Sequence, residues 1–359
     1  ATVPFRFRSS RFRNLDDLNL NGTVAALCIV IKEMTTVILF SLLGAASFTV
    51  YSRLFTKIAE TSKNTSLSAL IMYLYAALIL FIATAIATLF WRDSFQQFTL
   101  PPSTQLWARN LGGSSSIAID IALSILVMAF GYAVSIIAET RSRKEVNIGA
   151  FDTAYQLNSA VVVALTAVLS TEAISKGELW GGGIVVAASV LPITYRVLTD
   201  KTFSFKASLS TILSGVFCGI ALITDSNITK QIIYFPSFTS ERTPIFILYE
   251  AMTFFLPFLI GAAYYLLRFG TKTLCQDLTA TRSYQKNYWL AALFSALYFV
   301  FGVFAFASDT SLFAPGIFAS IPMINVFFDK NPRPIQQIYV EYLAASLVFL
   351  GLLLIAKII

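Results

Sequence analysis

The chain has 359 residues, of which 57% are hydrophobic and only 13% are charged, and its formal net charge is +7. Soluble domains carry about 25% charged residues, so this composition excludes an ordinary soluble domain. The absence of histidine excludes histidine metal ligands and catalysis by a histidine base. The three cysteines are isolated, and no phosphate-binding loop or zinc-protease motif occurs. We therefore expect no enzyme, no cofactor and no metal site.

Residues 1–34 are predicted to form a basic tail at the membrane surface. Arg6, Arg8, Arg11 and Arg13 alternate with aromatic residues, a combination that suits anionic lipid headgroups. Nothing else in the sequence supports nucleic-acid binding. The tail also lacks the apolar stretch of about 7–15 residues that marks a signal peptide.

Ten apolar runs follow, and a helix needs about 20 such residues to cross the bilayer core. They cover residues 35–55, 67–90, 117–139, 150–171, 178–196, 208–226, 244–267, 287–306, 311–328 and 338–358. The sequence therefore predicts an all-α polytopic membrane protein with ten transmembrane helices, embedded in a lipid bilayer.

The fourth and ninth runs share a register. The two segments are FDTAYQLNSAVVVALTAVLSTE (151–172) and SDTSLFAPGIFASIPMINVFFD (308–329). Each has an Asp-Thr pair at its second and third positions, and each ends on a carboxylate. Three other helix pairs match at offsets of 175, 174 and 171 residues, so one alignment relates residues 35–199 to residues 200–359. Because five is an odd number, the second half enters the membrane from the opposite side. This predicts two inverted five-helix repeats, the arrangement of many secondary transporters.

Ten helices in two such halves resemble the drug/metabolite transporter superfamily with its EamA-type repeat. LSTEAISKGELWGGGIVVAASVL (169–191) is similar to the acidic end of the fourth helix and the glycine-containing fifth helix of that repeat. In the second half, Asp329 stands where glutamate is usual. The resemblance implies alternating-access transport or export of a small-molecule substrate. We expect the cell (inner) membrane rather than an organelle membrane.

A second resemblance is to nucleotide-sugar transporters. Asp152, Tyr155 and Gln156, with Thr166 and Ala167, match positions of their fourth-helix signature, and VYSRL (50–54) is similar to a first-helix motif. The lysine of that signature falls on an apolar position here, near Val162, and the acidic-lysine end of their second helix is missing. Antiport of a nucleotide sugar or a phosphorylated metabolite is the alternative function. A non-transporting subunit of a membrane complex is a third interpretation, and a homodimer or a partner subunit stays open.

Two arguments on orientation disagree. Connectors after odd-numbered spans hold more lysine and arginine than the others, and the positive-inside rule places them in the cytoplasm. The family resemblance implies the reverse, with both termini cytoplasmic.

Carboxylates within the apolar runs each require an explanation, since a charged side chain at the bilayer centre costs about 2.5–3.5 kcal/mol. Glu250 lies about two turns into its span and matches Ala76 in the other half. It is either a substrate or proton site, or an interfacial carboxylate held by a loop arginine or lysine. Asp120 is expected to be a solvated helix end. Asp152 and Asp309, each followed by threonine, have the chemistry of helix N-caps.

Polar and aromatic residues of the predicted pathway are the remaining candidates. A polar patch opens the fourth span, and its alternative role is hydrogen bonding between helices. Pro315, Gly316, Pro322 and Asn325 interrupt the ninth span, and Gly181–Gly183 predict close helix packing. Glu172 and Asp329 could latch a closed state. The candidate substrate-binding residues are Tyr132, Tyr155, Gln156, Asn158, Ser159, Glu250, Tyr298 and Asn325.

Overall fold

The computed structural model describes residues 20–61, 64–92, 117–169, 175–200, 204–229, 242–281, 285–307, 321–322, 324–327, 329 and 333–355. The long elements in these ranges are all helices. They are α1 (Leu20–Thr61), α2 (Thr65–Phe90), α4 (Ile117–Ser142), α5 (Ile148–Tyr155), α6 (Leu157–Leu169), α7 (Lys176–Thr199), α8 (Phe205–Ile228), α9 (Thr243–Thr281), α10 (Gln285–Ala307) and α12 (Ile335–Ile355). Within the described residues, seven helices are long and apolar enough to cross a membrane. The protein is therefore an all-helical, multi-pass membrane protein whose helices contact the lipid bilayer.

The predicted spans coincide with observed helices along most of the chain. The first, second, third, fifth, sixth, seventh, eighth and tenth runs correspond to α1, α2, α4, α7, α8, α9, α10 and α12. The segment before the first run continues into it without a break, so α1 is 42 residues long. Helix α9 extends past its predicted end and kinks at Gly270, whose φ of 76° lies in the left-handed region that glycine tolerates.

Several predicted features lie outside the described residues. These include the arginines of the tail, Glu172, Asp309, Pro315 and Gly316. Of the predicted ninth span, residues 321–322 and 324–327 are described, and they are helical.

The predicted fourth span is two helices rather than one. Helix α5 ends at Tyr155 and α6 begins at Leu157, so the helix is interrupted at Gln156. The amide of Gln156 donates to the carbonyl of Thr153 at 3.3 Å, a tighter turn than an α-helix makes. Helix α5 begins at Ile148, with Asn147 in the N-cap position. Asp152 therefore lies inside α5, and the prediction that it caps this helix is wrong.

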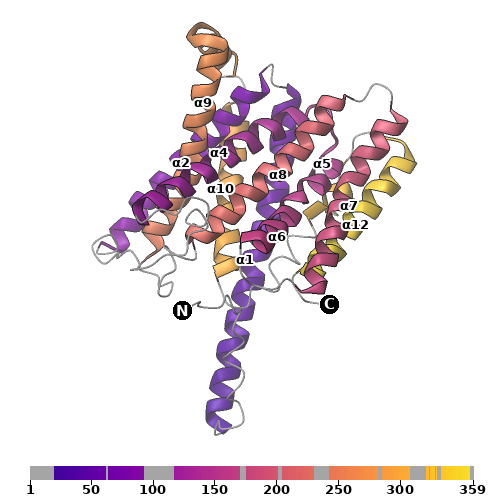
Figure 1. Ribbon diagram of the computed structural model, residues 1–359. Coiled ribbons are helices and arrows are strands. Elements are labelled where there is room, and N and C mark those ends of the chain that lie inside the picture. The colour runs from indigo at the N-terminus through magenta and orange to yellow at the C-terminus, as the bar shows by residue number, and fades with distance from the viewer. Residues whose placement is uncertain are drawn as a thin grey trace.

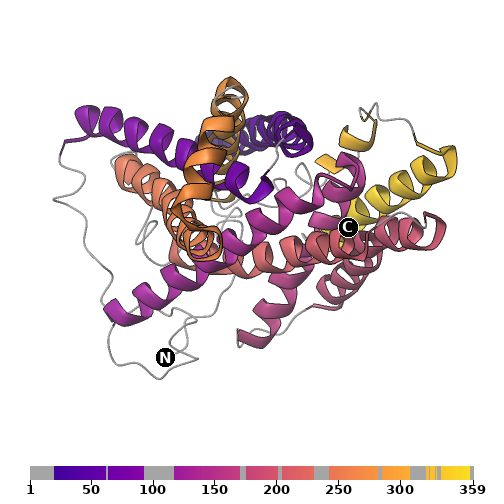
Figure 2. The ribbon, with the colours of Figure 1, turned by 90° about the horizontal axis from the view of Figure 1, so that it is seen from above.

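The helices pack mainly in pairs from distant parts of the chain. Helix α4 packs along α8, α1 along α10, α2 along α9, and α7 along α12. Figure 1 shows the α2/α9 pair at one end of the molecule and the α7/α12 pair at the other, with the remaining pairs between them. Seen from above, α7 and α12 again lie side by side (Figure 2). Helix α2 also packs on α10, and α4 on α9.

Small residues allow α4 and α8 to approach closely. A Cβ on Gly131 would lie 3.0 Å from the carbonyl oxygen of Phe217. Ser135 and Ser214 each donate a hydroxyl hydrogen bond to the other's carbonyl, at 2.9 and 3.1 Å. Small side chains and interhelical hydrogen bonds are the usual way in which membrane helices associate.

Glycine plays the same part where α7 crosses α12. A Cβ on Gly181 would lie 2.5 Å from the carbonyl oxygen of Gly351, and a Cβ on Gly351 would lie 2.8 Å from the carbonyl oxygen of Gly181. The close packing predicted for Gly181–Gly183 is confirmed at Gly181. It does not extend to Gly183, where an added Cβ would meet no atom within 4 Å.

This difference gives a matched pair of substitutions. Gly181→Ala is expected to destabilise the protein by about 1–3 kcal/mol, because the backbones must move apart to admit the methyl group. Gly183→Ala should leave the stability unchanged or raise it by up to about 1 kcal/mol, because its methyl group meets open space and alanine favours a helix more than glycine does. Unfolding in detergent measures both changes. Equal stability of the two variants would contradict the close crossing at Gly181.

Candidate functional site

A fully buried arginine follows the end of α4. Arg143 is 1% exposed. Its Nε lies 2.8 Å from Oε1 of Glu139, and its Nη2 lies 3.1 Å from Oδ1 of Asp152. The guanidinium also lies over the ring of Phe151, 4.1 Å from the ring centroid. A buried charge needs such partners, because leaving it unpaired away from water is costly.

Helix α1 supplies the other ligands of this arginine. Nη1 of Arg143 donates to the hydroxyls of Ser52 and Thr56, at 2.9 Å each. Burial lowers the pKa of Arg143. The neighbouring carboxylates of Glu139 and Asp152 raise it by more than burial lowers it, so the pKa lies above the ordinary value. Arg143 is therefore charged at every pH of interest.

Asp152 connects the arginine to a segment far along the chain. Its carboxylate accepts from the hydroxyl of Ser52, at 2.9 and 3.0 Å to its two oxygens, and from Nδ2 of Asn325 at 2.6 Å. We call the set Ser52, Thr56, Glu139, Arg143, Asp152 and Asn325 the Arg143 cluster. It joins α1, α4, α5 and the helical residues 324–327, so the start of the predicted fourth span lies against the end of the ninth.

The same contacts explain why Asp152 caps no helix. After α4 the chain turns back over residues 143–146, with the amide of Val146 donating to the carbonyl of Ser142 at 2.9 Å. This turn brings the guanidinium to the Asp152 carboxylate. A charge-assisted bond to a guanidinium is stronger than a bond to a neutral amide, so the carboxylate takes that partner.

A second polar group adjoins the Arg143 cluster. Glu341 on α12 accepts from Nδ2 of Asn147 at 3.3 Å and from Gln337 at 2.8 Å, and pairs with Nε of Arg333 at 3.2 Å. Arg333 also forms an ion pair with Asp329. Together the two groups connect the end of α1, the end of α4, the start of α5 and the start of α12. We call this side of the molecule the odd face, because odd-numbered predicted spans end there.

A third polar group occupies α8 and α9. Asp225 is 5% exposed, and its two oxygens accept from the phenols of Tyr132 at 2.9 Å and Tyr249 at 2.7 Å. Glu250 follows Tyr249 and is 0% exposed. Oε2 of Glu250 has only a long contact of 3.5 Å from the hydroxyl of Thr253. Its Oε1 has no hydrogen-bond partner among the described residues.

One of these positions corrects an expectation about buried carboxylates. Asp120 is 2% exposed and therefore is not a solvated helix end. Among the described residues, no arginine or lysine forms an ion pair with Glu250. The connecting residues 93–116 and 230–241 lie outside the described part of the chain, so an ion pair of Glu250 with a loop cation stays an alternative.

Two of the three aromatic candidates, Tyr155 and Tyr298, contact the same ring of α1. The ring of Phe48 on α1 lies 4.8 Å from that of Tyr298 and 6.4 Å from that of Tyr155, between centroids. The Tyr155 hydroxyl donates to Sγ of Cys218 at 2.9 Å. The structure thus brings Tyr155 and Tyr298 together, and it places Tyr132 and Glu250 in the separate group around Asp225.

The polar patch after the break in the fourth span bonds mainly within itself. Ser159 donates to Oδ1 of Asn158 at 2.9 Å, and Nδ2 of Asn158 lies 3.9 Å from Sγ of Cys218. Gln156 lies at the break and is partly exposed. Asn325 binds Asp152 as described above. Binding of a substrate by any of the candidates stays a prediction.

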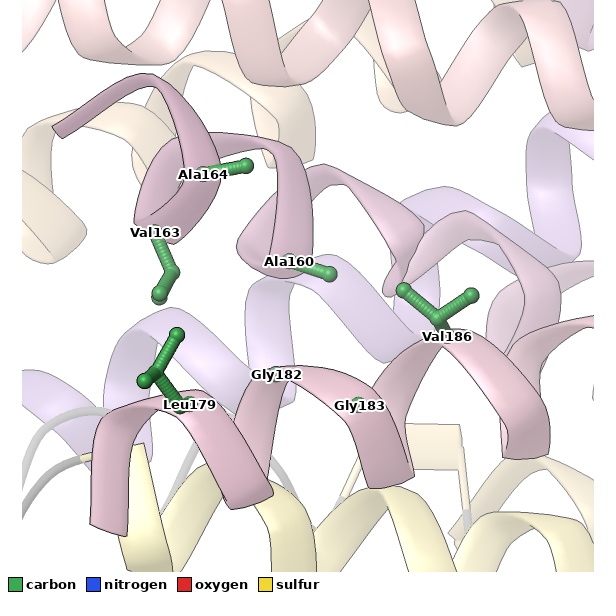
Figure 3. A pocket seen from close by; sticks show the side chains of 7 residues that line it. All are labelled: Ala160, Val163, Ala164, Leu179, Gly182, Gly183 and Val186. Carbon is green, nitrogen blue, oxygen red and sulfur yellow. The ribbon is translucent and has the colours of Figure 1, made fainter. Parts of the chain in front are cut away.

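An apolar pocket between α6 and α7 is a poor match for a polar solute. It is lined by Ala160, Val163, Ala164, Leu179, Gly182, Gly183 and Val186, all without polar side-chain atoms (Figure 3). Leu179 is 60% exposed and Val186 is 44% exposed. The pocket therefore opens on the outer surface of the helices, where lipid chains would lie.

Arg143 and Asp225 are among the residues of these groups that the sequence analysis missed. Arg143 lies in the charged run TRSRKE and resembles an ordinary connector residue. Its spacing of four residues from Glu139, within a run that closes an apolar helix, was the available signal. Asp225 lies in LITDSNI, where a single acid near the end of an apolar run resembles a solvated terminus.

No protein-family model and no curated protein matches this sequence.

Proposed function

We propose that this chain is a secondary transporter of a small metabolite that works by alternating access, built from two inverted five-helix repeats at residues 35–199 and 200–359. One observation carries the proposal: the helix pairs map onto one another when the two halves are exchanged. Such a fold has two related conformations, each open to one side of the membrane.

The exchange can be followed helix by helix. The proposed repeat relates α1 to α8, α2 to α9, α4 to α10, and α7 to α12. The pair α4/α8 then becomes α10/α1, and the pair α2/α10 becomes α9/α4. In all four of these pairs the two helices are in contact. The contact of α2 with α4 likewise becomes that of α9 with α10.

Two pairs become themselves under this exchange, as pairs on a pseudo-two-fold axis must. They are α2/α9 and α7/α12, the pairs at the two ends of the molecule in Figure 1. The reciprocal contact of Gly181 and Gly351 lies in one of them. An arrangement reached by chance packing would have no reason to follow this rule at both ends.

Buried ionisable groups support transport over a purely structural role. The Arg143 cluster lies at the odd face, while Asp225 and Glu250 lie near the end of α8 and the start of α9, toward the opposite face. Buried charges in membrane helices usually belong to substrate or ion pathways. Antiport of nucleotide sugars receives less support, because the buried cation Arg143 is already paired with two carboxylates and has little charge left for a diphosphate.

Solute binding followed by exchange tests the proposal. Purified protein is expected to melt at a higher temperature with a transported solute from a metabolite panel, since a ligand at 100 times its Kd stabilises by about 2.7 kcal/mol. Vesicles that contain the protein and are preloaded with that solute should then take up labelled solute in exchange. Empty vesicles are the control.

The same assay separates the alternatives. Exchange of nucleotide sugars alone would replace the leading proposal by the antiporter. A solute that binds but is never exchanged would contradict transport and favour a non-transporting subunit.

A further inference from the structure

Asp225 and Glu250 are two buried carboxyl groups in very different surroundings. Each oxygen of Asp225 accepts a phenolic hydrogen bond, and hydrogen bonds to a carboxylate stabilise its charged form. Among the described residues, Glu250 has one oxygen with no donor and one with a contact of 3.5 Å, and it is 0% exposed. Of the two groups, Asp225 is therefore suited to carry the negative charge.

The electrostatic surroundings add to this asymmetry. The carboxyl of Asp225 repels negative charge on Glu250, and no lysine or arginine of the described residues pairs with either group. The described side chains that contact the two carboxyls are Tyr132 on α4, Thr229 after α8, and Tyr249 and Thr253 on α9. Tyr132 and Tyr249 interact with both carboxyls. None of these groups supplies a positive charge.

We propose that Glu250 is the proton-binding site of this protein, with Asp225 as its charged neighbour. An ionised carboxylate in the position of Glu250 would have neither solvent nor a strong donor from the part of the chain that the structure describes, whereas a carboxylic acid needs neither. Pairs of carboxyls in unlike environments divide into one neutral and one charged member in this way.

Proton release requires a change of conformation. In this structure Glu250 is 0% exposed, so release of its proton to water requires the surrounding helices to move enough to admit a water molecule. The carboxylate then keeps the electron pair, and the proton passes to a water molecule. The coupling to transport rests on the proposed function. A substrate that binds better to one protonation state of Glu250 changes its proton affinity, and protonation changes the substrate affinity by the same factor. The proton would then be the coupling ion.

Infrared spectroscopy of the purified protein tests the site directly, with the proton itself as the probe. We expect the carbonyl band of a protonated carboxylic acid at about pH 7. An ordinary glutamate, with a pKa of about 4.3, is ionised at that pH and lacks this band. The band should be lost in Glu250→Gln and kept in Glu60→Gln, which changes an exposed glutamate on α1. In Asp225→Asn it should persist in acid and disappear at a lower pH than in the parent, because the repelling charge is gone.

Three results would overturn the inference. They are a parent spectrum without the band at neutral pH, a band that Glu250→Gln leaves unchanged, and a band that responds to sodium in place of choline at constant pH. No transported solute is present in these measurements. A band without solute exchange would therefore contradict the proposed transport alone, and exchange without a band would contradict the proton site alone.

Discussion

Replacing Arg143 by methionine is expected to destabilise the protein by about 3–5 kcal/mol, the usual cost of breaking a buried ion pair from one side. The side chain is 1% exposed, and its loss leaves Glu139 and Asp152 without their cation. The large cost comes from these two carboxyls rather than from the value of the ion pairs themselves. Unfolding of the purified protein in detergent measures it.

Two further variants separate this explanation from a general effect of losing an arginine. Arg141 is exposed and lies only two residues earlier, so Arg141→Met should change stability by less than about 1 kcal/mol, as exposed charges do. Adding Glu139→Gln and Asp152→Asn to Arg143→Met should restore part of the loss, because neutral amides cost less to bury than charges. If Arg143→Met unfolds like Arg141→Met, the cluster does not hold these helices together.

Joining residues 149 and 326 by a disulfide is expected to abolish transport, at the cost of a modest loss of stability. A Cβ on Gly149 would lie 3.2 Å from Cβ and 2.9 Å from Cα of Val326, so the two segments must move apart by a few tenths of an ångström to reach the Cβ separation of about 3.5–4.5 Å that a disulfide requires. The bond would fix α5 to residues 324–327 beside the Arg143 cluster. If the odd face must open in each cycle, this protein would remain in one state.

Solute exchange in vesicles, before and after reduction, measures this effect. The substitutions are made in a chain without Cys28, Cys218 and Cys275, the native cysteines. Reduction should restore exchange, and the single variants Gly149→Cys and Val326→Cys should respond to neither oxidant nor reductant. Full exchange by the oxidised double variant would contradict opening at this contact.

The sequence predicted helices better than it predicted the contacts of charged residues. Apolar runs depend on the local chain alone, and spans such as 67–90 and 117–139 coincide with α2 and α4 within a few residues. Asp152 shows the limit of this reasoning. An Asp-Thr pair at the start of an apolar run favours a helix cap, but Ser52, 100 residues away, and Arg143 occupy its carboxylate.

Glu250 was identified as a candidate because a lone carboxylate in an apolar run is informative without any structure. Its neighbour Asp225 was not, since the pairing depends on how α8 meets α9. The break at Gln156 was also beyond local reasoning. FDTAYQLNSAVV has the composition of a continuous helix, and the break follows from packing of α5 against residues 325–326 and of α6 against α8.

Distances between spin labels at Lys57 and Gln336 test alternating access most directly. Both residues are exposed, and they lie at the end of α1 and the start of α12, on the odd face and in opposite halves of the chain. We predict two populations of distances, with the longer one enriched by Asp152→Asn, which weakens the contacts of Arg143 and Asn325. A single narrow population, identical in the parent and in Asp152→Asn, would contradict the account.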